Sequence, residues 1–134
     1  MKIGVSSYSF MKFARETKCG YNAICDIAKE IGYDGIEFID LNAVCACPSN
    51  DEMKAAIDIS EYCAKIGLEI TAYTVSANFL SDDLPAELKR LRSCVDLTVA
   101  LGAKLMRHDA AWGPRPLFRY SYKNAIAEIA PHIR

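Results

Sequence analysis

Three consecutive polar residues, Arg107, His108 and Asp109, form the segment of this sequence best suited to chemistry. An imidazole titrates near neutral pH and can relay a proton or hydrogen-bond a hydroxyl, and a guanidinium can hold a phosphate or a carboxylate. The apolar pair before them predicts a strand that ends here, with Arg107 and Asp109 on one face and His108 on the other. We therefore predict His108 as a catalytic residue and Arg107 and Asp109 as substrate-binding residues. The alternatives are a histidine that ties a loop to the next strand and a salt bridge of Arg107 with Asp109 or Glu37.

Glu37 is a second candidate, because it is an ionisable residue inside an apolar stretch, 35–40. A carboxylate buried there costs free energy unless it has a partner. Glu37 is therefore either a catalytic carboxylate or a member of a buried ion network with Arg107 or Lys104.

Hydroxyl and aromatic side chains follow or end other predicted strands, where they suit hydrogen bonding to sugar hydroxyls and stacking on sugar rings. We predict substrate contacts from Ser6 and Tyr8 after the first strand, Tyr73 at the end of the third, and Trp112 in the loop after the fourth. Ordinary packing is the alternative for each, and Trp112 is also placed to contact a neighbouring subunit.

The sequence contains no motif that predicts a metal site. Cys45 and Cys47 are the one close thiol pair, and their spacing, with no second pair or histidine nearby, does not predict a zinc site. We predict no metal ligand from this chain. The six cysteines come without an export signal, so we expect reduced thiols and a cytoplasmic protein.

Composition excludes several other classes of function. The 134 residues carry 16 basic and 17 acidic side chains, for a net charge of −1, with 51% hydrophobic positions. Such a balance predicts no nucleic-acid partner. A basic, aromatic stretch at 113–123 is better read as a loop over a binding site. No apolar run approaches the roughly 20 residues that cross a bilayer, so we expect no membrane association.

The elements that position these residues repeat along the chain. Gly32, Gly67 and Gly102 are 35 residues apart, and each ends a helical pattern and precedes an apolar, strand-like run. We predict strands over 2–8, 35–40, 68–75 and 104–109. Between and after them, apolar residues three or four apart predict four helices with one buried stripe each. These stripes are Ala23, Ile24, Ile27, Ala28 and Ile31; Met53, Ala56, Ile57 and Ala64; Leu84, Leu88, Leu91, Val95 and Val99; and Ile126, Ile129 and Ile133.

Four strand–helix units predict an α/β fold with parallel strands joined by right-handed crossovers. No glycine-rich phosphate turn supports an open dinucleotide-binding sheet. A complete (β/α)8 barrel takes about 250 residues, so this chain is expected to be a (β/α)4 half of a TIM barrel with outer helices. The pattern stops before a fifth strand. We therefore expect either a piece of a longer protein or a homo-oligomer in which two copies complete a barrel.

Three segments carry a family resemblance: residues 1–6, residues 31–38 (Ile-Gly-Tyr-Asp-Gly-Ile-Glu-Phe) and residues 101–107. They resemble the N-terminal half of the sugar phosphate isomerases/epimerases, the xylose isomerase-like TIM barrels. On this resemblance residues 1–134 are a single domain, the N-terminal half of such a barrel. It implies a sugar or sugar-phosphate substrate and proton transfer between adjacent carbons, assisted by a divalent metal ion (Mn, Mg, Co or Zn). The family's metal ligands come from the second half of the barrel, outside this chain.

Two other functions remain open. One is a non-catalytic half-barrel, either a fragment or a module that dimerises through its open edges. The other is a repair enzyme of the endonuclease IV type, which the two histidines and the net charge of −1 disfavour.

Overall fold

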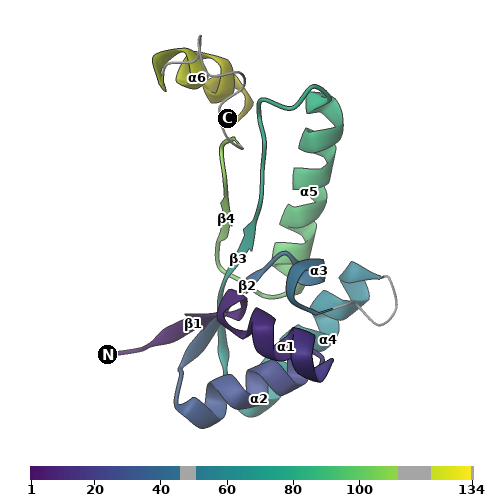
Figure 1. The fold of residues 1–134 in the computed structure, drawn as a ribbon, viewed down its shortest axis with the longest axis vertical. Helices are drawn as coiled ribbons and strands as arrows, with labels where there is room; N and C mark the ends of the chain where they lie inside the picture. Colours follow the sequence, from purple (N-terminus) through teal and green to yellow (C-terminus); the bar gives the residue numbers. More distant parts are fainter. Residues whose placement is uncertain (46–50, 112–121, 134) are drawn as a thin grey trace.

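The four strands form one parallel sheet. The computed structural model describes residues 1–45, 51–111 and 122–133. Strands β1 (Gly4–Ser6), β2 (Gly35–Ile39), β3 (Glu69–Val75) and β4 (Met106–His108) lie in the order β1-β2-β3-β4, as Figure 1 shows. The predicted α/β class and parallel pairing are confirmed. The sheet is open, and β1 and β4 are its edges.

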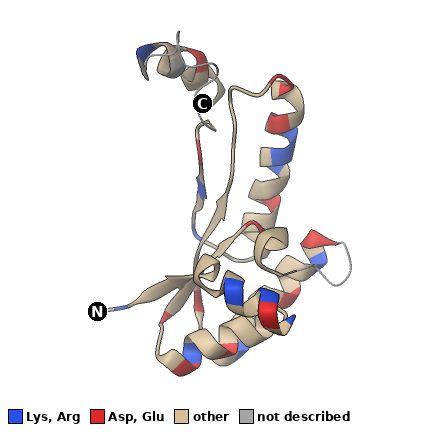
Figure 2. Ribbon diagram, viewed as in Figure 1, with Lys and Arg blue, Asp and Glu red and all other residues tan. Residues whose placement is uncertain are grey.

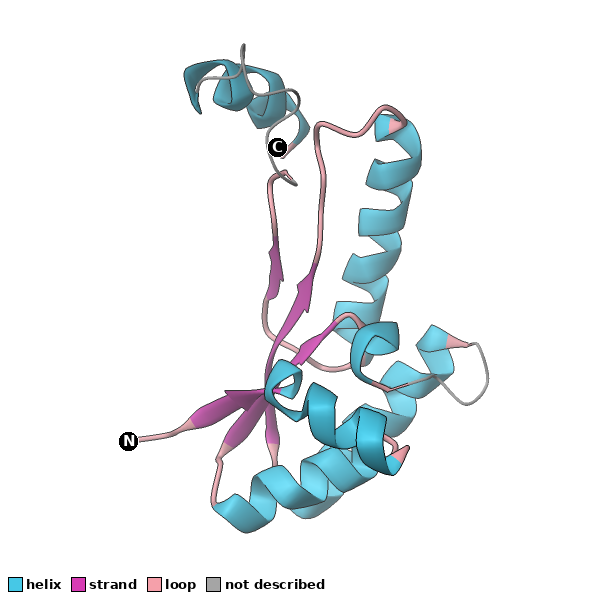
Figure 3. Ribbon diagram, in the orientation of Figure 1, coloured by secondary structure: helices cyan, strands magenta, loops and turns pink. Residues whose placement is uncertain are grey.

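Helices separate the strands, and the long ones match the predicted repeat. They are α2 (Tyr21–Ile31), α4 (Glu52–Ile66) and α5 (Leu84–Ala100), with α6 (Tyr122–Ile129) and the 3-10 turn η2 (Ala130–His132) after β4. Helix α6 lies beyond the C-terminal ends of β3 and β4, apart from the other helices (Figures 1 and 3). None of the helices in the described part of the chain has the length and hydropathy needed to span a membrane.

Three short elements at the C-terminal ends of β1 and β2 were not predicted: η1 (Ser7–Phe10), α1 (Met11–Thr17) and α3 (Leu41–Val44). The predicted first strand is therefore too long, because Ser6 caps η1 by accepting a hydrogen bond from Tyr8 N at 3.4 Å. Helices of four to seven residues contain too few turns to show a periodic stripe, so the sequence carries little signal for them.

The repeated glycines end helices as predicted. Gly32, Gly67 and Gly102 have φ values of 103°, 67° and 69°, in the left-handed region that a side chain disfavours. The Gly32 N–H also donates to the Lys29 carbonyl at 3.0 Å, which satisfies one of the last carbonyls of α2.

The core lies between the sheet and the helices. Ile36 and Phe38 of β2 and Tyr73 and Val75 of β3 are buried with Ile24 of α2, each at most 2% exposed. Because side chains alternate along a strand, the residues between them lie on the opposite face, which we call the inner face. Helices α4 and α5 contact β3, and η1 and α3 contact β2.

The predicted stripe of α5 is partly wrong. Val95 and Val99 are 47% and 74% exposed, whereas Cys94, Leu97 and Thr98 face the core. This helix has apolar residues on more than one stripe, and the choice between them depends on tertiary packing. Two other residues that the sequence predicts to be buried, Ile31 and Ile57, are also exposed, at 61% and 45%.

One of the three segments that carry the family resemblance, residues 31–38, joins α2 to β2. The Asp34 carboxylate accepts a hydrogen bond from Ile3 N at 2.7 Å, and Asp34 N donates to the Ile3 carbonyl at 2.8 Å. A Cβ on Gly35 would lie 2.7 Å from Thr71 Cγ2 and 2.9 Å from the Glu69 carbonyl. Asp34 and Gly35 are therefore structural residues that align the first three strands.

Candidate functional site

A row of polar side chains crosses the inner face of the sheet. Ser6 lies opposite Glu37 in the register of β1 and β2, and Thr74 lies opposite Arg107 in that of β3 and β4. Thr74 Oγ1 donates a hydrogen bond to Glu37 Oε1, and Arg107 Nε lies 3.8 Å from the same oxygen. We call Ser6, Glu37, Thr74 and Arg107 the polar row. It has one residue on each of the four strands, toward the C-terminal ends where barrel proteins place their active sites.

The irregular pairing of β2 with β3 makes this contact. Ile36 pairs with Ile70, but Glu37 pairs with Ala72, so Thr71 is an extra residue on β3. Its hydroxyl donates to the Ile36 carbonyl at 3.1 Å. A one-residue bulge reverses the face of every later side chain, which brings Thr74 to the face of Glu37 and turns Tyr73 away.

The two charged residues of the row differ in exposure. The side chain of Glu37 is 26% exposed and that of Arg107 is 70% exposed. Glu37 is thus held within the sheet surface, whereas Arg107 extends into solvent. The ion pair of Arg107 with Glu37, one of the alternatives in the sequence analysis, is present in the structure.

The ends of β1 and β2 are held together beside this row. Ser7 is fully buried, and its hydroxyl accepts a hydrogen bond from Ile39 N at 3.0 Å. Tyr8 follows with its side chain exposed, at 66%. Ser6 and Tyr8 thus lie at the C-terminal end of β1, where Ser6 Oγ accepts from Tyr8 N.

Tyr73 and His108 lie on the other face of the sheet. Tyr73 is 1% exposed, and its burial raises the pKa of its hydroxyl above the usual range. The His108 ring packs on Phe79 with centroids 5.5 Å apart. His108 also lines a cavity of about 460 Å³ with residues of α5 and η2. The structure therefore does not bring these two predicted site residues to the polar row.

The tautomer of the neutral His108 ring follows from its contact with the next residue. His108 Nδ1 lies 2.8 Å from the carbonyl oxygen of Asp109, and a carbonyl only accepts hydrogen bonds. Nδ1 therefore carries a proton, which leaves Nε2 as the basic nitrogen of the neutral ring. Asp109 is exposed at the end of β4, and Trp112 lies outside the described residues.

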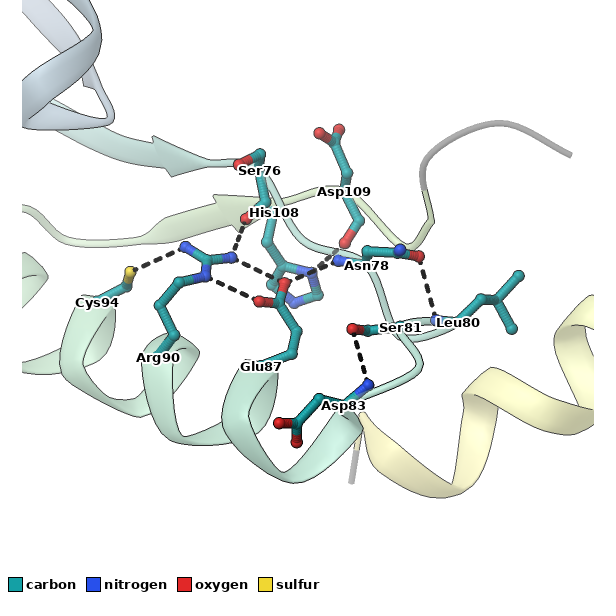
Figure 4. Close-up of polar contacts among 10 residues, drawn as sticks. All are labelled: Ser76, Asn78, Leu80, Ser81, Asp83, Glu87, Arg90, Cys94, His108 and Asp109. Atoms are coloured by element: carbon teal, nitrogen blue, oxygen red, sulfur yellow. Dashed lines mark hydrogen bonds and ion pairs between the residues drawn. The ribbon is translucent and has the colours of Figure 1, made fainter. Parts of the chain in front are cut away.

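A second polar cluster, which the sequence analysis did not identify, holds the loop after β3 (Figure 4). Arg90 donates two hydrogen bonds of 2.8 Å to the Glu87 carboxylate and a third, of 2.6 Å, to the Ser76 carbonyl. Glu87 also accepts from Asn78 N at 2.9 Å. We call Glu87 and Arg90 the clamp. Its signal in the sequence is a Glu–Arg pair three residues apart on a helix, which occurs on many solvated helices.

The loop that the clamp holds also contacts β4 and the loop after it. Phe79 N donates to the Ala110 carbonyl at 3.0 Å, and the Phe79 ring contacts His108. The loops after β3 and β4 are therefore joined to each other and to α5.

The described residues do not form a metal site. No group of three His, Cys, Asp or Glu side chains in the described part of the chain is arranged to hold an ion. The five described cysteines are free thiols. The buried pair Cys25 and Cys63, with Sγ atoms 3.6 Å apart, packs α2 against α4.

A parallel sheet with a polar inner face, helices on the other face and polar strand ends is the arrangement of half a TIM barrel. The family model described as "Xylose isomerase-like TIM barrel" matches residues 25–134, most of the chain. This chain belongs to that family, as the resemblance of its α2–β2 segment indicates. A search of curated proteins found no match.

Proposed function

We propose that this chain supplies part of the active site of an isomerase or epimerase that transfers a proton between adjacent carbons of a sugar or sugar phosphate. The polar row carries this proposal. It places a carboxylate, a hydroxyl donor and a cation together on the inner face of a xylose isomerase-like barrel sheet. Family membership supports sugar processing in general. The polar row supports proton transfer as the type of reaction that we propose.

Glu37 is the proposed acid–base group. Thr74 donates to Glu37 Oε1, which leaves Oε2 to accept a proton from substrate. Arg107, which extends from the same face, would bind a phosphate, a carboxylate or a developing oxyanion. Ser6 and Tyr8 would hydrogen-bond substrate hydroxyls at the end of β1.

The remaining predicted residues keep their proposed roles, although they lie away from the row. His108 would relay protons through Nε2, and Asp109 would fix the His108 ring through its carbonyl. Substrate contacts from Tyr73 and Trp112 also stay predictions. The free thiols agree with the cytoplasmic location that we propose.

The divalent metal ion (Mn, Mg, Co or Zn) implied by the resemblance does not fit the described residues, which offer no ligand set. An ion in this protein would need ligands from elsewhere. The roles proposed above concern the chain's own groups only.

Hydrogen exchange into the substrate tests this function. The full protein would be incubated in D₂O with aldoses, ketoses and their phosphates, and deuterium at the carbon next to the carbonyl would be followed by NMR. Glu37→Gln is expected to slow exchange by about 10²–10⁴-fold. Glu30→Gln, on the exposed face of α2, is the matched control.

Three results would contradict the proposal. A folded Glu37→Gln protein with wild-type exchange would remove Glu37 from the mechanism. Exchange that survives chelation and dialysis would contradict metal assistance. A protein that exchanges none of these sugars, with or without added divalent ions, would contradict the reaction class.

A second candidate function is a module that completes a barrel by pairing. In the described sheet β1 and β4 each have one neighbouring strand, and such edges favour further pairing. Light scattering of the 14.8 kDa chain would then give about twice that mass, because two copies close one barrel. A stable monomer of this chain would exclude the module.

A further inference from the structure

A cavity of about 430 Å³ opens between α1 and α3, at the C-terminal ends of β1 and β2. Its apolar walls include Met11 and Val44, and its charged residues are Arg15 and Lys18. The volume falls within the range of small-molecule sites, which is roughly 300–1,000 Å³. It is formed by the short elements that the sequence did not predict, and it shares no residue with the polar row.

The charge in this cavity has one sign. No carboxylate is among the described residues that line it, and neither Arg15 nor Lys18 has an ion-pair partner within the described part of the chain. By contrast, Lys12 on the same helix lies 3.9 Å from Glu16 and outside the cavity. Figure 2 shows basic positions, in blue, along α1. Two cations at one cavity, with no ion-pair partner among the described residues, favour an anionic ligand.

The backbone at Lys18 supports a role for its side chain. Lys18 has φ of 56°, the one positive φ at a non-glycine residue in the described chain. Glycine or asparagine is the usual residue where a helix ends in this conformation. Lysine is therefore found where glycine would be less strained, and Lys18 lines the cavity.

We propose that this cavity binds a small phosphate monoester. A guanidinium group can hold two phosphate oxygens at once, and an ammonium group adds a second point charge. The apolar walls would contact the organic part of the ester. Gly20 also lines the cavity, and a Cβ placed on it would meet nothing within 4 Å.

The test measures binding, so it does not depend on the reaction proposed above. The full protein labelled with ¹⁵N would be titrated with glycerol phosphate, and separately with inorganic phosphate, at ionic strength held constant with chloride. We expect saturable chemical-shift changes at the amides of residues 18–20. The ester should bind at least as tightly as the free ion. Arg15→Gln and Lys18→Gly are each expected to weaken binding at least fivefold.

Controls separate binding from folding. Lys18→Gly relieves the positive φ, so its thermal midpoint should equal or exceed that of the wild type while its affinity falls. Lys12→Gln removes a cation from the same helix outside the cavity and should change affinity less than twofold. The proposal is overturned if Lys12→Gln weakens binding as much as Lys18→Gly does. It is equally overturned if both cavity variants bind like the wild type, or if inorganic phosphate binds and the ester does not.

Discussion

The clamp between Glu87 and Arg90 gives the sharpest quantitative prediction. Arg90→Ala removes two hydrogen bonds to the carboxylate and one to the Ser76 carbonyl, and leaves Glu87 with Asn78 N. A buried hydrogen bond to a charged group contributes about 1.5–3 kcal/mol. Solvent reduces this here, because the side chains of Arg90 and Glu87 are 40% and 14% exposed. We expect the free energy of unfolding to fall by about 2 kcal/mol.

Urea unfolding at pH 7 measures this loss. The matched control is Lys54→Ala, which breaks an ion pair on α4 whose partners are 61% and 56% exposed. That variant should lose only about 0.3–0.5 kcal/mol. Native-state hydrogen exchange then locates the effect. The amides of Asn78 and Phe79 should exchange faster in Arg90→Ala by a larger factor than that of Ile39, which is bonded to Ser7 at the far side of the sheet.

The pH dependence of the difference adds an independent check. The hydrogen bonds from Arg90 hold the pKa of Glu87 below its ordinary value, against the opposing effect of burial. A lowered carboxyl pKa stabilises the fold above the unfolded pKa, about 4.3, and this stabilisation is lost as the pH falls below it. The gap between wild type and Arg90→Ala should therefore be full at pH 7 and narrow in acid. A loss below 0.5 kcal/mol at pH 7, or acceleration at all three amides alike, would refute the clamp's local role.

Three further predictions concern the framework of the fold. Gly35→Ala should cost about 2 kcal/mol in urea unfolding, because its Cβ would lie 2.7 Å from Thr71 Cγ2, and a Thr71→Ser partner should recover part of the loss. Hydrogen bonds from two lysines lower the pKa of Glu69 to about 2. An acid titration should therefore show that the wild type is more stable than Glu69→Gln above about pH 4.5. This difference in the free energy of unfolding should close toward pH 2. Cys25 and Cys63, 0% and 1% exposed, should react with a thiol reagent only after urea is added, and rapid labelling of the native protein would contradict their burial.

Much of the fold is predictable because its signals are local. The spacing of Gly32, Gly67 and Gly102 reports helix ends, and each has the left-handed backbone that favours glycine. The choice of buried stripe is not local. In α5 the exposed Val99 is as apolar as the buried Leu97, and only contact with the sheet and α4 distinguishes them.

The site was less predictable, because a single extra residue in β3 decides which side chains share a face with Glu37. Strict alternation from the pairing of Gly35 with Glu69 would put Tyr73 on the face of Glu37, whereas the bulge at Thr71 puts Thr74 there. Bulges of this kind leave no reliable trace in a single sequence. The ion pair of Glu37 with Arg107 was foreseeable only as one of several pairings, since it joins non-adjacent strands.

The position of Glu37 ties the site to the fold. Glu37 lies between the fully buried Ile36 and Phe38 of β2, and its own side chain is 26% exposed on the inner face. The partners that make this tolerable come from β3 and β4 rather than from β2 itself, so Glu37 is correctly held only when the four-stranded sheet is complete. Stability alone does not require such an arrangement, because an apolar residue at this position would need no partners. A carboxylate on the inner face, with one oxygen held by Thr74 and the other free to act on a substrate, is what the acid–base role that we propose for Glu37 requires.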